Sequence, residues 1–247
     1  MELFGFNWRV GRSWGIAHPA HICYNDPCSV HIENGHFRLG IDYKPTTLVV
    51  DGEEINYDFS VGYVSSIDTI KYGHLKVTYR LPLGKNLWPA IWLTDAKTWP
   101  PEIDIMEAWS DNYEWPCKPK ATDKIYRINP FANNIFPGLV LGNCIDNKHG
   151  KSYRTFRGSL ACYIDVTKDN TCEIEWQKDR IRIYYNGHKV ADEKDPKALQ
   201  YFNDSEGMEI HLNNYVQNDF TRYDYNQMKW YDEYSPDFII HDLVYEK

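Results

Sequence analysis

Three carboxylates stand close together in one short apolar segment, Glu102-Ile103-Asp104-Ile105-Met106-Glu107. On a regular strand Glu102 and Asp104 share one face, while the isoleucines beside them point to the opposite face. Glu107 falls out of step with this alternation. A β-bulge near Ile105 or Met106 would return Glu107 to the acidic face, and bulges are frequent beside active sites. The spacing therefore predicts a bulged strand that presents three acids in a row.

Acids in such a row have the spacing that cleavage of a glycosidic bond requires. The α-carbons of Glu102 and Glu107 would lie roughly 13 Å apart, at about 3.3 Å per residue. Leaning side chains bring their carboxyls to roughly 5 Å, the separation found in retaining glycosidases, whereas an inverting pair stands further apart to admit water. Crowding raises the pKa of at least one of the three acids, which then carries a proton near neutrality. The leaving oxygen of a glycoside needs such a proton.

Tryptophans concentrate around the acids. Five of the nine in the chain lie in this region: Trp88, Trp92, Trp99, Trp109 and Trp115. Aromatic rings beside carboxylates suit the apolar C–H faces and polar rims of sugars, which favours a saccharide cleft. Two other interpretations stay open from the chemistry alone: a solvated acidic face of an antiparallel sheet, and a site that binds a hard cation such as calcium through carboxylate oxygens.

The composition argues against several classes of partner. The 247 residues hold 27 Lys and Arg against 35 Asp and Glu, a formal net charge of −8, so the phosphates of a nucleic acid or an anionic membrane would be repelled at long range. No apolar run reaches the length of about 18 residues that a spanning helix needs. We expect a monomer with no nucleic-acid and no membrane partner. The segment 1–8 shows no secretory signal, which indicates either a protein that acts inside a cell or a chain from which an export signal was removed.

Short segments of alternating or β-branched residues recur along the chain and predict an all-β fold. Turn signals such as Asp51-Gly52 and Asn186-Gly187 separate them, and this spacing is typical of an antiparallel sandwich or barrel. No linker or repeat interrupts residues 1–247, which predicts a single domain. The stretch 112–136 lacks strand periodicity and predicts a long loop.

Helix is scarce in the sequence pattern. The best candidate is 195–202, where Asp195 could cap the first turn and Pro196 would take the first helical position. No run of alternating strands and helices follows this segment. The pattern therefore argues against a parallel α/β fold.

Several segments on either side of the acids follow the pattern of a known family. They are Lys71-Tyr72-Gly73, Arg80-Leu81-Pro82, Trp88-Pro89-Ala90-Ile91-Trp92, the acidic segment itself, and downstream Glu173–Trp176, Asp179–Gly187 and Phe238–Tyr245. Together they resemble glycoside hydrolase family 16, whose members with the six-residue acid motif include laminarinases, agarases and carrageenases. The resemblance covers most of the chain, and the acid motif with its upstream Trp-Pro-Ala-x-Trp is the most specific part.

The resemblance implies a β-sandwich jelly roll of two antiparallel sheets with a concave substrate cleft. It implies retaining hydrolysis of internal β-1,3 or β-1,4 linkages in a β-glucan or β-galactan, without an organic cofactor. By position, Glu102 would be the nucleophile, Asp104 the residue that holds and tunes it, and Glu107 the general acid and base. The family also suggests a secreted or periplasmic protein, with the cytoplasm open as the alternative.

Further residues gain candidate roles from the same resemblance. Trp88 and Trp92 would line the donor side of the cleft, Trp109 is a candidate acceptor-side platform, and Arg80 is a candidate substrate-binding cation. Asp242 is a candidate ligand of a structural calcium ion, because some members hold one near the last strand. The family's Glu-x-Arg-x-Lys pattern is absent from the strand that ends in Arg-Leu-Pro, which weakens a laminarinase assignment.

Two rival functions stay open beside hydrolysis. One is a non-catalytic, lectin-like carbohydrate-binding jelly roll, in which the aromatic residues bind and the acids are remnants or cation ligands. The other is a transglycosylase, which shares the covalent intermediate but transfers the sugar to another sugar. The sequence favours hydrolysis because all three acids are present.

Weaker motifs lie near the N-terminus. Residues 11–15 match the Gly-x-Ser-x-Gly pattern of a nucleophile elbow, but that elbow needs the strand and helix of an α/β sheet around it. His18, His21, Cys23 and Cys28 match the ligand spacing of a structural zinc site only loosely. Cys23 and Cys28 are also the nearest pair for a disulfide, which the sequence leaves open.

Overall fold

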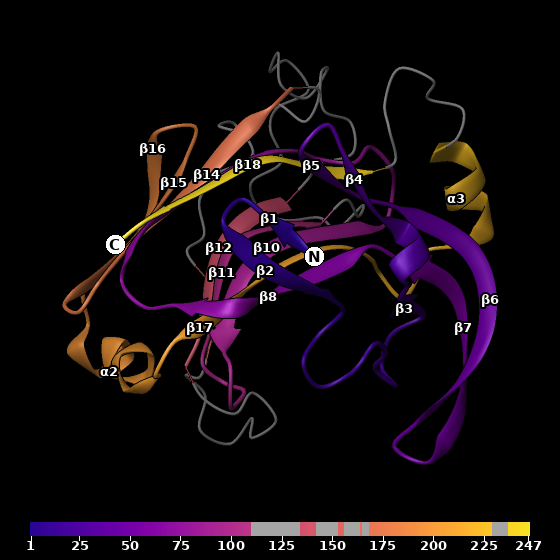
Figure 1. Cartoon of the computed structure of the whole chain (residues 1–247), viewed down its shortest axis with the longest axis horizontal. Coiled ribbons are helices and arrows are strands. Elements are labelled where there is room, and N and C mark those ends of the chain that lie inside the picture. The colour runs from indigo at the N-terminus through magenta and orange to yellow at the C-terminus, as the bar shows by residue number, and fades with distance from the viewer. Residues whose placement is uncertain (110–133, 142–152, 156–163, 165–167, 229–236) are drawn as a thin grey trace.

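Antiparallel strands form most of the regular structure. The computed structural model describes residues 1–109, 134–141, 153–155, 164, 168–228 and 237–247. Two large sheets pack face to face, and a smaller curved sheet extends beside them (Figure 1). The prediction of an all-β sandwich of the jelly-roll type is confirmed. Most of the predicted loop 112–136 lies outside the described residues.

The first large sheet carries the acidic segment. In the described part of the chain it has eight strands, in the spatial order β1 (Glu2–Leu3), β2 (Phe6–Val10), β8 (Tyr63–Ile70), β17 (Met208–Val216), β10 (Leu87–Asp95), β11 (Glu102–Trp109), β12 (Asn134–Val140) and β13 (Tyr153–Thr155). The acidic strand β11 therefore lies well inside the sheet, between β10 and β12. Hydrogen bonds on both of its edges hold it in place.

The second large sheet covers the apolar face of the first. Its seven described strands have the order β16 (His188–Glu193), β15 (Arg180–Tyr185), β14 (Asn170–Gln177), β9 (Gly73–Arg80), β18 (Phe238–Glu246), β5 (His36–Leu39) and β4 (Val30–Glu33). The third sheet contains β3 (Cys23–Asn25), β7 (Glu53–Val61) and β6 (Ile41–Val50). Within it β3 runs parallel to β7.

Helices are short, as the sequence predicts. Those in the described part of the chain are the 3-10 turn η1 (Pro27–Ser29) and the α-helices α2 (Pro196–Asp204) and α3 (Arg222–Met228). At the start of α2, an Asp195 oxygen accepts a hydrogen bond of 3.0 Å from the Lys197 amide, so the predicted cap is confirmed and the helix ends two residues beyond Phe202. None of the helices in the described ranges has the length and apolarity needed to cross a membrane.

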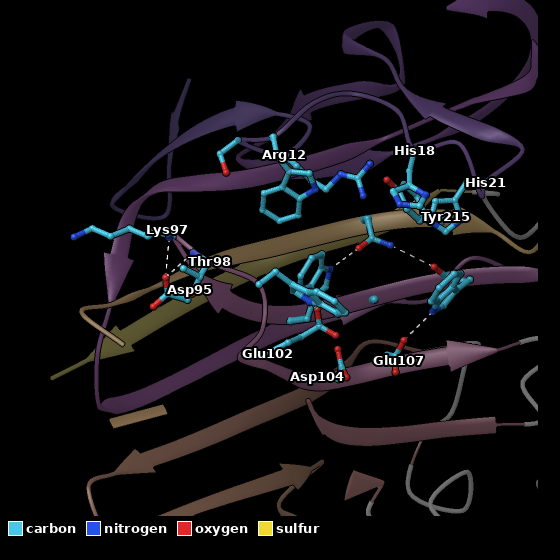
Figure 2. Close-up of a pocket in the computed structure, with 18 residues that line it drawn as sticks. Arg12, His18, His21, Asp95, Lys97, Thr98, Glu102, Asp104, Glu107 and Tyr215 are labelled. Carbon is cyan, nitrogen blue, oxygen red and sulfur yellow. Dashed lines mark hydrogen bonds between the residues drawn. The ribbon is translucent and has the colours of Figure 1, made fainter. Parts of the chain in front are cut away.

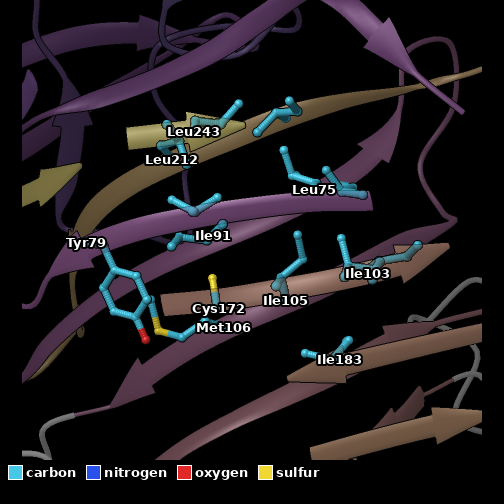
Figure 3. Packing of buried hydrophobic residues seen from close by; sticks show 14 of the residues in the cluster. Leu75, Tyr79, Ile91, Ile103, Ile105, Met106, Cys172, Ile183, Leu212 and Leu243 are labelled. Carbon is cyan, nitrogen blue, oxygen red and sulfur yellow. The ribbon is translucent and has the colours of Figure 1, made fainter. Parts of the chain in front are cut away.

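The core lies between the two large sheets (Figure 3). Strand alternation supplies it: Ile103 and Ile105 of β11 face Ile183 of β15 and Leu75 of β9, and all four are buried. Burial of these side chains stabilises the sandwich by about 1.5 to 3 kcal/mol each as an upper figure. The same alternation leaves the opposite face of β11 for the acids.

Candidate active site

A cavity of about 770 Å³ lies on the face of the first sheet opposite the core. Its lining comes from β10, β11 and β17, from the segment between β2 and β3, and from the segment between β10 and β11. Figure 2 shows Glu102, Asp104 and Glu107 along β11 on one side of this cavity. The structure thus brings together the three acids that the sequence singled out.

The predicted bulge is present in β11. The register against β10 shifts by one residue at Ile105, and the register against β12 shifts between Asp104 and Glu107. Ile105 and Met106 are both fully buried, so the extra residue returns Glu107 to the acidic face. The Tyr185 hydroxyl, from the opposite sheet, donates a hydrogen bond of 2.9 Å to the Ile105 carbonyl. That bond satisfies a carbonyl group at the bulge.

Glu102 is half-buried beside Asp104 at one end of the row. Burial raises the pKa of Glu102, while hydrogen bonds from Trp99 and with Asp104 oppose that rise. The Trp99 indole nitrogen donates at 2.9 Å to Oε2 of Glu102. A hydrogen bond between two carboxyl groups requires one proton, so the Glu102–Asp104 pair titrates as a unit.

Glu107 lies at the other end of the row and is 8% exposed. The indole nitrogen of Trp88, on β10, donates a hydrogen bond of 2.9 Å to its Oε1 atom. Trp88 therefore contacts one outer acid and Trp99 the other. Each of the two glutamates has a neutral donor that orients its carboxyl group without neutralising its charge.

Trp92 lines the cavity between these two ends and is held by β17. Its indole nitrogen donates at 2.7 Å to Oδ1 of Asn213. Its ring stacks on His211, with centroids 4.2 Å apart and planes 21° from parallel. His211 is fully buried and shares a hydrogen bond of 2.7 Å with the Tyr63 hydroxyl. The ring of Trp92 is thus fixed on one face by His211 and at its edge by Asn213.

The segment between β2 and β3 forms a further wall that sequence reasoning missed. Arg12, Ser13, Trp14, His18 and His21 all line the cavity. Their only signal in the sequence was the Gly-x-Ser-x-Gly match and the pair of histidines, and neither indicated a position beside the acids. Ser13 is exposed in a turn rather than set between a strand and a helix, so the nucleophile-elbow interpretation is wrong.

The chain resembles glycanases in sequence and in fold. It is 32% identical over 164 residues to the endo-1,3-1,4-beta-glycanase EglC of Rhizobium meliloti strain 1021, a match that covers 65% of this chain and 30% of that protein. The chain therefore spans about a third of the length of this relative. No family model matches the sequence.

Two solved structures illustrate the likeness of fold. SCLam, a non-specific endo-beta-1,3(4)-glucanase from family GH16, has a TM-score of 0.64 at 19% identity over 96% of this chain and 83% of its own. The catalytic domain of an endo-1,3-beta-glucanase from Thermotoga petrophila RKU-1 has a TM-score of 0.62 at 16% identity over 98% of this chain and 99% of its own. With the bulged acid motif in place, these likenesses agree with the sequence relative. The chain shares the fold of SCLam, a family GH16 enzyme, and resembles a glycanase in sequence over 65% of its length.

The other residues proposed from the family 16 pattern have different outcomes. Trp88 and Trp92 line the cavity as predicted. Trp109 ends β11, but its side chain lies outside the described part of the structure. Arg80 does not line the cavity; it lies on β9 in the second sheet, where its Nε donates at 2.7 Å to Asp169. The prediction that Arg80 binds substrate there is wrong, because its strand belongs to the sheet on the far side of the core.

The metal and disulfide interpretations are not supported by the described residues. Asp242 is exposed on β18, and an oxygen of its carboxylate accepts a hydrogen bond of 2.9 Å from the Leu243 amide. Among the residues described, no group of three or more His, Cys, Asp or Glu side chains could hold a metal ion, so the side chains present do not fit calcium at Asp242 or zinc near His18. Cys23 is a buried free thiol and Cys28 an exposed one, so no disulfide joins them.

Proposed function

We propose that this chain is a retaining endo-glycoside hydrolase that cleaves internal β-1,3 or β-1,4 linkages of a β-glucan or β-galactan. The observation that carries the proposal is the row of three carboxyl groups on β11, in which an indole donor holds each outer glutamate at 2.9 Å. A β-glucan is favoured, because the names of EglC and SCLam describe enzymes that act on 1,3 and 1,4 linkages.

The first step of the proposed reaction forms a glycosyl ester on Glu102. Glu107, in its protonated form, donates its proton to the glycosidic oxygen as the bond from that oxygen to the anomeric carbon breaks. The Glu102 carboxylate attacks the anomeric carbon from the opposite side of the sugar. The leaving chain departs as a neutral alcohol, and Glu107 is left as a carboxylate.

Asp104 positions the nucleophile in this scheme. Burial raises the pKa of Glu102, which works against the ionised form that attack requires. The two side chains share one proton. When that proton stays bonded to Asp104 and forms a hydrogen bond to Glu102, the negative charge remains on the nucleophile. The Trp99 indole nitrogen donates to the same carboxylate and favours that charge further.

The second step returns the enzyme to its starting state. Glu107 accepts a proton from a water molecule, whose oxygen attacks the anomeric carbon on the face that the leaving chain vacated. The ester bond to Glu102 breaks and its electron pair returns to the carboxylate. Two inversions give a product with the original configuration. In this scheme Trp88 and Trp92 bind the donor sugars and Trp109 the acceptor.

Two variants test the roles of the glutamates. Glu102→Gln should abolish release of reducing ends from barley β-glucan or another responsive polymer. Glu107→Ala should lose hydrolysis of polymers, and added azide should restore turnover of an aryl glycoside by attacking the ester on Glu102, which gives a glycosyl azide of retained configuration. Glu173→Gln is the matched control, because Glu173 lies on β14 in the second sheet and pairs with His74 and Lys76. Near wild-type turnover by Glu102→Gln would remove the nucleophile assignment.

The rival functions give different results in the same assays. A carbohydrate-binding jelly roll would bind the polymer and release no reducing ends during long incubation. A transglycosylase would give longer products when an acceptor oligosaccharide is added. Product analysis by mass, with and without acceptor, separates all three.

Two further expectations accompany the proposed function. A hydrolase of extended polysaccharides is of use where those polymers occur, which supports a secreted or periplasmic protein. We also propose that the chain is a monomer, which light scattering coupled to size-exclusion chromatography would test. Neither expectation enters the mechanism.

A further inference from the structure

Arg12 is a cation in the cavity wall with no acidic partner among the described residues. Five other arginines pair with carboxylates: Arg9, Arg38, Arg80, Arg180 and Arg182. Lys97, which also lines the cavity, pairs with Glu206. Two nitrogens of Arg12, Nε and Nη2, are buried and have no hydrogen-bond partner. Buried donors of a charged group cost free energy when they are left unpaired. The rest of the Arg12 side chain lines the cavity, where its charge can meet a group from outside the chain.

The turn around Arg12 holds its backbone firmly. The Gly11 amide donates at 2.9 Å to the Tyr63 carbonyl, and the Ser65 hydroxyl donates at 2.7 Å to the Gly11 carbonyl. Arg12 and Gly15 exchange two backbone hydrogen bonds of 3.3 Å each. Gly11 has a φ of +78°, which glycine adopts without strain. The guanidinium group is therefore carried on a turn that is anchored to β8.

Two aromatic rings hold the guanidinium group itself. Its carbon lies 5.6 Å from the centre of the Trp14 ring and 6.0 Å from that of Tyr63. These contacts use the faces of the rings and leave N–H groups of Arg12 for another acceptor. A guanidinium group held in this way suits a charge-assisted hydrogen bond to a carboxylate or sulfate group. The half-exposed ring of Trp14 could cover the adjoining sugar.

Arg12 lies across the cavity from the three acids (Figure 2). His18, His21 and Tyr215 line the cavity on its side. Burial, followed by the positive charges of His18 and Arg12, lowers the pKa of His21 to about 4, so His21 is neutral near pH 7. An anion at Arg12 would meet a positive charge and neutral donors there, while the acids stay on the opposite wall.

We propose that Arg12 forms a subsite for an anionic substituent, a carboxylate or a sulfate ester, on the saccharide that occupies the cavity. The saccharide part of this inference rests on the proposed function, and the anion part rests on the unpaired guanidinium. Such a subsite would favour chains decorated with acidic groups over plain ones. The specificity arises from a segment outside the catalytic strand.

Binding to the Glu102→Gln protein tests the proposal without turnover. Three probes with one sugar ring isolate the charge: methyl β-D-glucoside, its 6-sulfate and methyl β-D-glucuronide, compared at constant ionic strength by titration of protein NMR signals. Both anionic probes, or one of them, should bind more tightly than the glucoside. A preference between the sulfate and the carboxylate identifies the substituent.

Variants of Arg12 in the same background decide the assignment. Arg12→Met should weaken binding of the preferred anionic probe about tenfold or more, and Arg12→Lys should lose part of that affinity because lysine lacks the planar fork. Lys97→Met, which removes the other cation in the wall, should change it less than twofold. Circular dichroism checks that each variant folds, and Arg12→Lys keeps the test valid should Arg12→Met unfold.

Two results would overturn the anion subsite. One is equal affinity of the Glu102→Gln protein for the glucoside and both anionic probes. The other is an equal loss for charged and neutral probes in Arg12→Met, which would make Arg12 a ligand of sugar hydroxyls. Failure of the hydrolysis assays would count against the proposed function instead, because the anion measurements use a protein that does not turn over.

Discussion

The indole nitrogen of Trp88 lies 2.9 Å from Oε1 of Glu107 and donates a hydrogen bond to it. The two residues belong to neighbouring strands, β10 and β11, and the bulge of β11 puts them within reach. A carboxyl group that must first give and then take a proton needs a fixed orientation in both states. The indole supplies a donor that does not titrate, so it can serve the carboxylate without competing for the proton.

Replacing Trp88 with phenylalanine should therefore reduce kcat by about tenfold, the effect of losing about 1.4 kcal/mol of transition-state stabilisation. The ring is largely kept, so affinity should change less. Trp92→Phe is the matched control, since it removes an indole donor that binds Asn213 at 2.7 Å rather than an acid. That variant should change KM more than kcat. Equal losses of kcat in both variants would show that the bond to Glu107 has no special role.

Trp99→Phe should move the acidic limb of the pH profile. Burial raises the pKa of Glu102, and the Trp99 hydrogen bond opposes that rise. Loss of the donor raises this pKa further, so the ionised nucleophile is lost at a higher pH as the solution is acidified. The acidic limb of the kcat/KM profile should therefore move to higher pH, by a modest amount because Trp99 is exposed and solvent screens the bond. A limb that stays in place or moves to lower pH would contradict this prediction.

Tyr185→Phe should destabilise the fold at the bulge. The variant leaves the buried Ile105 carbonyl without the hydrogen bond of 2.9 Å that it now accepts, at a cost of about 1 to 3 kcal/mol. For a chain of this size that lowers Tm by about 2 to 8 °C. We also expect lower activity, because the bulge sets the position of Glu107.

Tyr79 offers a close comparison for that substitution. It is also fully buried, on β9 of the same sheet, but its hydroxyl has no hydrogen-bond partner among the described residues. Tyr79→Phe should therefore leave Tm unchanged or raise it, because it removes a buried polar group that is unsatisfied. A larger loss of Tm for Tyr79→Phe than for Tyr185→Phe would contradict the prediction that the hydrogen bond to the Ile105 carbonyl stabilises the fold.

The catalytic strand was predictable from sequence because its chemistry and its periodicity are local. Alternation places Ile103 and Ile105 in the core and leaves Glu102 and Asp104 on the opposite face. Only an extra residue in the strand puts Glu107 on that same face. The cap of α2 was predictable for the same reason, since Asp195 and Lys197 are close in sequence. Local rules need no knowledge of distant partners.

Residues that depend on distant pairing were harder to place. Arg80 was assigned to the cleft, but β9 pairs with β14 and β18 in the other sheet, and no local pattern distinguishes the two sheets. Arg12 and His21 belong to an irregular segment without periodicity, so no sequence pattern predicts the direction in which their side chains point. Their place in the cavity wall opposite the acids depends on contacts with distant strands, including that of Gly11 with Tyr63 of β8.

His211 should make stability depend on pH. Burial, then the charges of Arg9 and Arg12, keep its pKa well below the usual value, so it stays neutral beneath Trp92 in the folded protein. In the unfolded chain it takes a proton below about pH 6.5. The unfolded state then binds more protons, and stability falls as the pH falls below about 6.5, by up to about 1.4 kcal/mol per pH unit from this group.

His211→Gln should remove that contribution while leaving an amide oxygen to accept from the Tyr63 hydroxyl, the partner of His211 at 2.7 Å. Unfolding in urea between pH 5 and 7 measures the effect, and the variant should show a flatter dependence of the unfolding free energy on pH. His31→Gln, at an exposed position on β4, should keep the wild-type slope because its surroundings change little on unfolding. If His211→Gln and the wild type lose stability in parallel on acidification, His211 is not the group that makes the unfolding free energy depend on pH.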